Sequence, residues 1–243
     1  GLKAALGDKT RLIVAKGADI DSQDTTGFAD AVAAAKQADA VVMFLGEHPD
    51  MSAEANNRTS LDLPGVQEQL ALAVAATGKP VALVLLNGRP LSIGRLKGKV
   101  PAILEAWFPG VEGGPAIADV LFGDVNPSAK LPVTFPHNVG QVPIYYAHKN
   151  TGRPPSEQEK YTSKYLDVPW TPLYAFGHGL SYTTFRYDAP VVSKKTLVAS
   201  ALQQQVSVRV TNTGKRAGEE VVQLYVRDDV ASVTRPVKQL RGF

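Results

Sequence analysis

The strongest constraint on the fold of this chain is the alternation of short, wholly apolar runs with segments of helical periodicity. Residues 40–45 read AVVMFL, and residues 81–86 read VALVLL. Apolar runs of this length, without polar interruption, are typical of strands that are buried on both faces. The larger part of the chain is therefore predicted to be an α/β sandwich, a mostly parallel sheet with helices on both faces.

The same pattern predicts the limits of the individual elements. Pro64 is suited to the first turn of a helix, and Gly78 to the position just after the last turn. The expected strands are residues 11–15, 40–45, 81–86 and 102–106, and the expected helices are residues 28–38, 64–76 and 114–122.

The character of the sequence changes toward the C-terminus. Residues 126–187 are rich in Pro, Gly and aromatic residues, and long irregular segments of this kind are usually functional or packed over a neighbour. Residues 206–210 and 222–226 alternate apolar with polar side chains, which is typical of antiparallel strands. We therefore expect two domains, residues 1–187 and residues 188–243.

The second domain is expected to be a truncated antiparallel β-sandwich. Its sequence indicates three or four strands, whereas a complete sandwich of this type has about seven.

Composition excludes several classes of function. The 26 basic and 23 acidic residues are scattered along the chain, which argues against a nucleic-acid partner. No apolar run approaches the roughly 20 residues that span a bilayer, so no membrane partner is expected. The chain has no Cys and its histidines lack metal-ligand spacing, so neither a metal nor a cofactor is expected.

Two glutamates lie where functional residues of open α/β sheets are usually found. Glu47 follows the strand at residues 40–45, and Glu54 lies in the loop beyond it. Ligands of such sheets bind beyond the carboxyl ends of the strands. Position alone also allows a structural reading, in which Glu47 hydrogen-bonds to backbone and Glu54 is a solvated loop residue.

Five sequence blocks, in the same order, resemble glycoside hydrolase family 3 in its β-glucosidase and β-xylosidase branch. The blocks are GEHPDMSAEANNRTSLDLP (46–64), KPVALVLLNGRP (79–90), AWFPGVEGGPAIADVLFGDVNPSAKLPVTFP (106–136), PLYAFGHGLSYTTF (172–185) and VRVTNTGKRAGEEVVQLYV (208–226). The resemblance implies an enzyme with a catalytic barrel first, an α/β sandwich domain second and a fibronectin type III-like domain third. The barrel, its aspartate nucleophile and the beginning of the second domain are expected to lie outside this chain.

The resemblance also implies a set of site residues. In the resembling enzymes the acid/base glutamate precedes the L-x-L-P block, which places it on Glu54 and the arginine that follows on Arg58. In the resembling enzymes the usual sequence at this point is Glu-Gly followed by Asp-Arg. This chain has Glu-Ala-Asn-Asn-Arg, which resembles a bacterial periplasmic subgroup. Arg58 either holds the loop or binds sugar, and His48 either contacts a sugar hydroxyl or caps a turn. Glu47 is a further candidate for sugar binding and the second candidate for the acid/base.

The sequence is thus interpreted as part of a retaining β-glucosidase that releases terminal, non-reducing β-linked glucose from oligosaccharides. Such enzymes need two carboxyl groups about 5–5.5 Å apart, so this chain without the barrel is expected to be inactive. A β-xyloside is the alternative substrate. The sequence leaves a homodimer open, and the resemblance alone implies a periplasmic or secreted location.

Two other classes of function are weighed against this interpretation. The chain could be a non-catalytic carbohydrate-binding or scaffolding module, which should bind sugar without a barrel. A nucleotide-binding, flavodoxin-like protein is disfavoured because neither a Gly-x-Gly-x-x-Gly turn nor a P-loop follows any expected strand.

Overall fold

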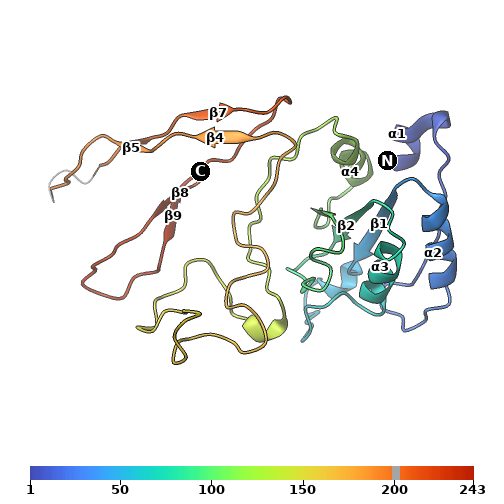
Figure 1. Cartoon of the computed structure of the whole chain (residues 1–243), viewed down its shortest axis with the longest axis horizontal. Coiled ribbons are helices and arrows are strands. Elements are labelled where there is room, and N and C mark those ends of the chain that lie inside the picture. The colour runs from blue at the N-terminus through green and yellow to red at the C-terminus, as the bar shows by residue number, and fades with distance from the viewer. Residues whose placement is uncertain (199–202) are drawn as a thin grey trace.

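The computed structural model describes residues 1–198 and 203–243, and its N-terminal part is a parallel sheet with helices packed around it (Figure 1). The sheet has the order β1-β2-β3. Both of its strand pairs are parallel, which confirms the predicted α/β class. The strands are β1 (Val41–Gly46), β2 (Val81–Leu86) and β3 (Ala102–Glu105).

The helices lie close to their predicted positions. Helix α2 contacts α3, whereas the short N-terminal α1, which was not predicted, contacts α4 (Figure 1). Helix α3 begins at Gln67 rather than at Pro64, because Gly65 has a φ of +58° and a left-handed residue cannot continue a helix. The helices are α1 (Leu2–Leu6), α2 (Phe28–Gln37), α3 (Gln67–Ala75) and α4 (Gly113–Phe122), with short 3₁₀ turns η1 (Gly7–Lys9), η2 (Pro49–Met51) and η3 (Val139–Gln141).

The main hydrophobic core includes one face of the sheet together with residues of α2 and α3. On β2, Leu83 and Leu85 point into this core and are fully buried. Val84, which points to the opposite face, is fully buried as well. The central strand is therefore covered on both faces, as its continuous apolar sequence predicts.

The prediction of a strand at residues 11–15 is wrong for this structure. These residues form no strand. In the described part of the chain, no backbone hydrogen bond joins them to a neighbouring segment. A strand needs a neighbour that takes up its backbone groups, so the local sequence pattern is insufficient by itself.

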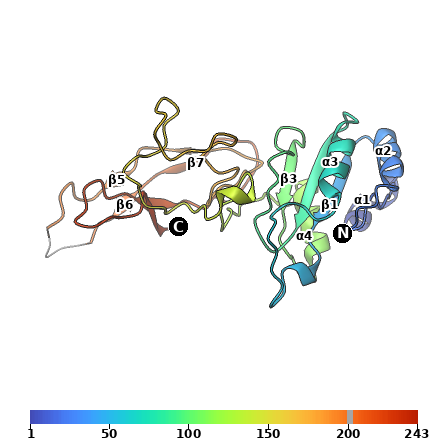
Figure 2. The ribbon, with the colours of Figure 1, turned by 90° about the horizontal axis from the view of Figure 1, so that it is seen from below.

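The C-terminal region consists of small antiparallel units, and Figure 2 shows it beside the parallel sheet along the long axis of the molecule. The described residues from 188 onward hold five short strands rather than three or four, partly because the alternating segment at 206–210 is divided between two of them, and a sixth strand lies just before residue 188. Strand β4 (Phe185–Tyr187) pairs with β7 (Val210–Asn212), β5 (Val191–Val192) with β6 (Val206–Ser207), and β8 (Leu224–Val226) with β9 (Gln239–Gly242). The domain boundary at 187/188 stays a prediction.

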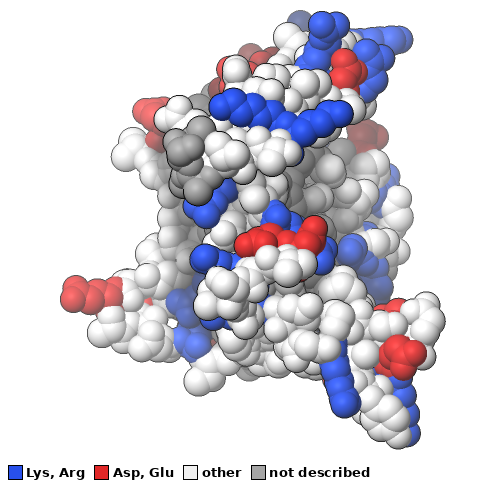
Figure 3. Space-filling view, turned by 90° about the vertical axis from the view of Figure 1, so that its left-hand side faces the viewer, with Lys and Arg blue, Asp and Glu red and all other residues white. Residues whose placement is uncertain are grey.

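The surface at the antiparallel end of the molecule mixes basic, acidic and uncharged side chains (Figure 3). Several lysines and arginines adjoin one another in the upper part of this view, and acidic residues lie beside them and elsewhere on the face. None of the helices in the described residues is both long enough and apolar enough to cross a bilayer.

The core position of Leu83 leads to a first prediction. Truncation to alanine should leave a cavity between the sheet and α3, and such changes typically cost about 2–5 kcal/mol of the free energy of unfolding. Leu83→Ala should therefore shift the urea midpoint strongly, whereas Leu180→Ala, at a position 77% exposed, should barely change it. Equal shifts for the two variants would contradict the assignment of the core.

Candidate functional site

The carboxyl end of β1 directs Glu47 into the interior of the protein. The backbone N–H of Glu47 donates to the Leu86 carbonyl at 2.8 Å and so continues the parallel pairing with β2. The preceding Gly46 has a φ of +148°, and a Cβ atom there would collide with the same carbonyl. Glycine is therefore required at this position, and the side chain of Glu47 has no exposed area.

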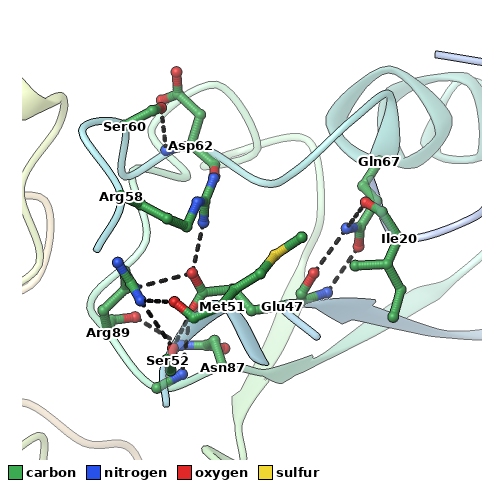
Figure 4. A network of polar contacts seen from close by, with 12 residues as sticks. Ile20, Glu47, Met51, Ser52, Arg58, Ser60, Asp62, Gln67, Asn87 and Arg89 are labelled. Atoms are coloured by element: carbon green, nitrogen blue, oxygen red, sulfur yellow. Dashed lines mark hydrogen bonds and ion pairs between the residues drawn. The ribbon is translucent and has the colours of Figure 1, made fainter. Parts of the chain in front are cut away.

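Both carboxylate oxygens of Glu47 are engaged by protein groups (Figure 4). Oε1 accepts a hydrogen bond from Arg58 Nη1 at 2.5 Å. Arg89 Nε lies 3.0 Å from the same oxygen, as an ion pair without hydrogen-bond geometry. Oε2 accepts from Ser52 Oγ at 3.0 Å and from the Gly88 N–H at 3.1 Å. A buried carboxylate is tolerated only when it is compensated by partners of this kind.

The two arginines extend this network to the backbone of the loop that follows β1. Arg58 Nη2 donates to the Asp62 carbonyl at 2.9 Å. Arg89 Nη2 donates to the Met51 carbonyl and, at 3.1 Å, to Ser52 Oγ. The loop is therefore held at residues 51–52 and again at Arg58, and residues 53–57 lie between these two points.

Glu54 lies on this short span, whose residues 53–57 are all exposed. The span is a tight turn in which the Asn56 N–H donates to the Ala53 carbonyl at 3.1 Å. Ala55 has a φ of +61°, a left-handed conformation that costs a residue with a Cβ atom roughly 1–2 kcal/mol. The resembling family usually has glycine here, which adopts this conformation without that cost.

His48 caps the 3₁₀ turn η2 that begins the loop. Its Nδ1 accepts a hydrogen bond from the Asp50 N–H at 3.3 Å and lies 3.3 Å from Asp50 Oδ2. This is the structural role that the sequence left open for His48, and the side chain remains 52% exposed. Sugar binding by His48, Glu47 and Arg58 stays a prediction, as does the acid/base role of Glu54.

The structure thus brings Glu47 and Arg58 together, and it adds Arg89, which the sequence reasoning did not single out. Arg89 lies three residues after the last residue of β2, and β2 pairs in parallel with β1, so that the carboxyl ends of the two strands meet at one edge of the sheet. The sequence feature that could have pointed to Arg89 is the NGRP segment after an apolar run. This segment indicates a site residue only once the order of the strands is known.

Gln67, at the start of α3, fixes the end of β1 from the side opposite to β2 (Figure 4). It is buried, with only 3% of its surface exposed. Its Oε1 accepts from the Gly46 N–H at 2.8 Å, and its Nε2 donates to the carbonyls of Gly46 and Ile20, both at 2.7 Å. The backbone immediately before Glu47 is therefore held on both sides.

A second acidic side chain, Glu105, ends β3 at the same edge of the sheet. Its Oε1 accepts from the Trp107 N–H at 3.1 Å. Its Oε2 and Asn87 Oδ1 are buried and have no hydrogen-bond partner among the described residues. Burial raises the pKa of Glu105 to about 7, with a small further contribution from the Glu47 charge. The hydrogen bond from the Trp107 N–H and the nearby Asn87 side-chain amide oppose this rise in pKa.

The described residues contain no group of three or more His, Cys, Asp or Glu side chains that could hold a metal ion. Trp107 is half-buried, and its ring centroid lies 5.9 Å from that of Phe135. This contact makes Trp107 part of an aromatic cluster, and its φ of +52° turns the chain after Glu105.

The raised pKa of Glu105 predicts a specific pH dependence of stability. The unfolded chain releases this proton near the ordinary value of 4.5, and the folded chain near 7. The free energy of unfolding should therefore fall as the pH rises between these two values, because the folded state must lose a proton that it binds more tightly. Glu105→Gln cannot ionise and should lack this fall in urea titrations at pH 5 and pH 8.

Glu112→Gln is the matched control for this measurement, since Glu112 is an exposed glutamate before α4. It should keep the pH dependence of the parent chain. If Glu105→Gln also kept it, Glu105 would not be the group responsible.

Comparison with protein families gives two matches along the chain. Residues 1–182 match the model of the glycosyl hydrolase family 3 C-terminal domain. Residues 220–243 match that of a fibronectin type III-like domain. The first match covers the parallel sheet and the whole of the Glu47 network.

Curated relatives and solved structures agree with these matches. A periplasmic β-glucosidase of Salmonella typhimurium is 49% identical over the whole chain, which covers 34% of that protein. A β-xylosidase of Formosa agariphila is 48% identical, again over the whole chain and 33% of the relative. The crystal structure of a β-glucosidase from Listeria innocua matches 93% of the chain with a TM-score of 0.87 at 40% identity, over 31% of its own length. The chain thus spans about one third of these relatives.

Proposed function

Because the chain belongs to glycoside hydrolase family 3, we propose that it is the part of a retaining β-glucosidase that supplies the general acid/base, Glu54. The intact enzyme would release terminal, non-reducing β-D-glucosyl residues from oligosaccharides. The observation that carries this proposal is the placement of Glu54 on an exposed turn that is held on both sides by one buried ionic network.

Glu54 suits the acid/base role better than Glu47 does. A general acid must come within hydrogen-bond reach of the glycosidic oxygen. The Glu47 carboxylate is buried, and both of its oxygens are occupied by protein donors. We therefore assign Glu47 and Arg58 to holding the loop, with His48 as the remaining candidate for contact with sugar.

The proposed reaction proceeds by double displacement. Glu54 protonates the leaving oxygen while an aspartate elsewhere in the intact enzyme attacks the anomeric carbon. Glu54 then deprotonates the water that releases the glycosyl-enzyme intermediate. A carboxyl on a short, anchored turn can reach a sugar that another domain binds, and the anchors restrict its position before the reaction begins.

The preferred sugar is proposed to be glucose, with a β-xyloside as the second candidate because one relative of nearly equal identity is a β-xylosidase. We further propose a periplasmic or secreted location, on the basis of the periplasmic relative from Salmonella.

Replacement of Glu54 tests the acid/base assignment in the intact enzyme. General acid–base catalysis typically contributes about 10²–10⁴-fold, so Glu54→Ala should lower kcat on cellobiose by roughly that factor. Azide should restore turnover of an aryl glucoside with a good leaving group, because that substrate needs no proton donor and azide replaces the water step.

Glu157→Ala, which removes an exposed carboxylate far along the sequence, should retain the parent activity. Near-normal cellobiose hydrolysis by Glu54→Ala, or a failure of azide to restore aryl glucoside turnover, would show that another group is the acid/base.

Assays on the 243-residue chain alone distinguish the proposal of an enzyme part from that of a stand-alone carbohydrate-binding module. It should neither hydrolyse a nitrophenyl β-glucoside nor bind cellobiose in calorimetry, because the nucleophile and most of the sugar pocket are expected on the barrel. Measurable cellobiose binding would favour the module instead, and turnover by highly purified chain would contradict the missing nucleophile.

A further inference from the structure

Two buried oxygen atoms at the carboxyl edge of the sheet are acceptors without a donor among the described residues. These atoms are Glu105 Oε2 and Asn87 Oδ1. Folded proteins rarely leave such atoms unpaired, because a buried polar group without a hydrogen bond is costly. When Glu105 is ionised, both atoms can only accept, so neither can satisfy the other.

The two side chains are neighbours on the sheet. Glu105 ends β3 in register with Leu85 of β2, and Asn87 follows Leu85 by two residues. Side chains two residues apart along a strand point to the same face. The Asn87 amide is also close enough to influence the pKa of Glu105. One proton on Glu105 would satisfy both oxygens, because the carboxyl group then donates and Asn87 Oδ1 accepts.

Asn87 connects this pair to the loop that carries Glu54. Its Nδ2 donates to the Arg89 carbonyl at 2.8 Å. The guanidinium of Arg89 in turn holds the loop through the Met51 carbonyl and Ser52 Oγ (Figure 4). The orientation of one buried amide therefore decides whether the backbone at Arg89 has its donor.

We propose that Glu105 is a positioning residue for the Glu54 loop: as a neutral acid it donates to Asn87 Oδ1, which keeps Asn87 Nδ2 directed at the Arg89 carbonyl. When Glu105 loses its proton, its carboxylate needs a donor. In the present orientation Asn87 makes no hydrogen bond to Glu105 Oε2, so the amide must turn over to supply one. Its oxygen then faces the Arg89 carbonyl, and the loop loses that support.

The surroundings of Glu105 favour its neutral form up to about neutral pH. Burial is the main reason that its pKa is raised to about 7. Among the described residues, Glu47 is the one charged group that contributes, and its negative charge raises the pKa further. The two arginines at this edge, Arg58 and Arg89, are both paired with Glu47. With a pKa near 7, the protonated fraction falls from about nine-tenths at pH 6 to about one-tenth at pH 8.

The effect on catalysis rests on the proposed function, and pH profiles of the intact enzyme test it. An aryl glucoside with a good leaving group needs no proton donor, and ionised Glu54 is the form that deprotonates water. Loss of the Glu54 proton therefore does not lower kcat on this substrate. In the parent, kcat should fall several-fold from pH 6 to pH 8, up to about ninefold if only the protonated form positions the loop.

Glu105→Gln separates this role from a merely structural one. Its amide is a permanent donor to Asn87 Oδ1, so the variant should keep the parent kcat at pH 6 and lose the fall toward pH 8. Glu112→Gln, at an exposed position before α4, should show the same fall as the parent. An equal fall in Glu105→Gln would contradict the proposal. Failure of Glu105→Gln to fold would also contradict it, because the amide supplies the same donor in nearly the same volume.

Infrared spectroscopy tests the protonated pair without reference to catalysis. The difference spectrum between the parent and Glu105→Gln should show the C=O stretch of a hydrogen-bonded carboxylic acid at pH 6, and a carboxylate at pH 8. Absence of the acid band at pH 6 would overturn the proposal. Glu54→Ala should leave these bands unchanged even if Glu54 is not the acid/base, so that the two proposals fail separately.

Asn87→Ala tests the connection between Glu105 and the loop. Without this amide the state of Glu105 no longer reaches the Arg89 carbonyl, so kcat at pH 6 should be lowered. In this background, Glu105→Gln should no longer raise kcat at pH 8, which is the non-additivity expected of residues in one network. A rise as large as that in the parent background would show that Glu105 acts by another route.

Discussion

The loop that carries Glu54 depends on one buried anion. Removing a carboxylate from water costs several kcal/mol, and the Glu47 side chain is fully buried. The cost is offset because Arg58 and Arg89 supply positive charge and because Ser52 and Gly88 donate to the second oxygen. These partners come from the loop and from the turn after β2, so a single carboxylate joins two separate segments to the end of β1. The position of residues 53–57 follows from this arrangement.

Most of the parallel sheet could be predicted from the sequence, because burial on both faces leaves a direct signal in the residues themselves. The contacts of the site could not be predicted to the same degree. The approach of Arg89 to Glu47 depends on the pairing of Gly46 with Leu86, and nothing in either local sequence specifies that register. A single arginine in a loop is normally solvated, so the NGRP segment carried no distinct signal until β1 and β2 were known to be neighbours.

At residues 11–15, by contrast, the sequence predicted an element that the structure does not contain. Their sequence has the pattern of a strand, yet the described residues offer them no strand partner. A strand forms only when two segments pair, and the sequence pattern of one segment carries no information about its partner.

The start of α3 differs from the prediction for a local reason. Pro64 is compatible with a first helical turn, but the left-handed Gly65 delays the helix to Gln67, where the side chain of Gln67 can close the end of β1.

The carboxyl end of this sheet and its loop carry three glutamates in three different environments. Glu47 is buried with two arginines, whereas Glu105 is partly buried and has no cation paired to it among the described residues, and burial raises its pKa to about 7. Glu54 is exposed. A proton donor at neutral pH needs a raised pKa, and desolvation is one established cause of such a rise. Glu105 shows that this domain can raise the pKa of a carboxyl group chiefly by desolvation.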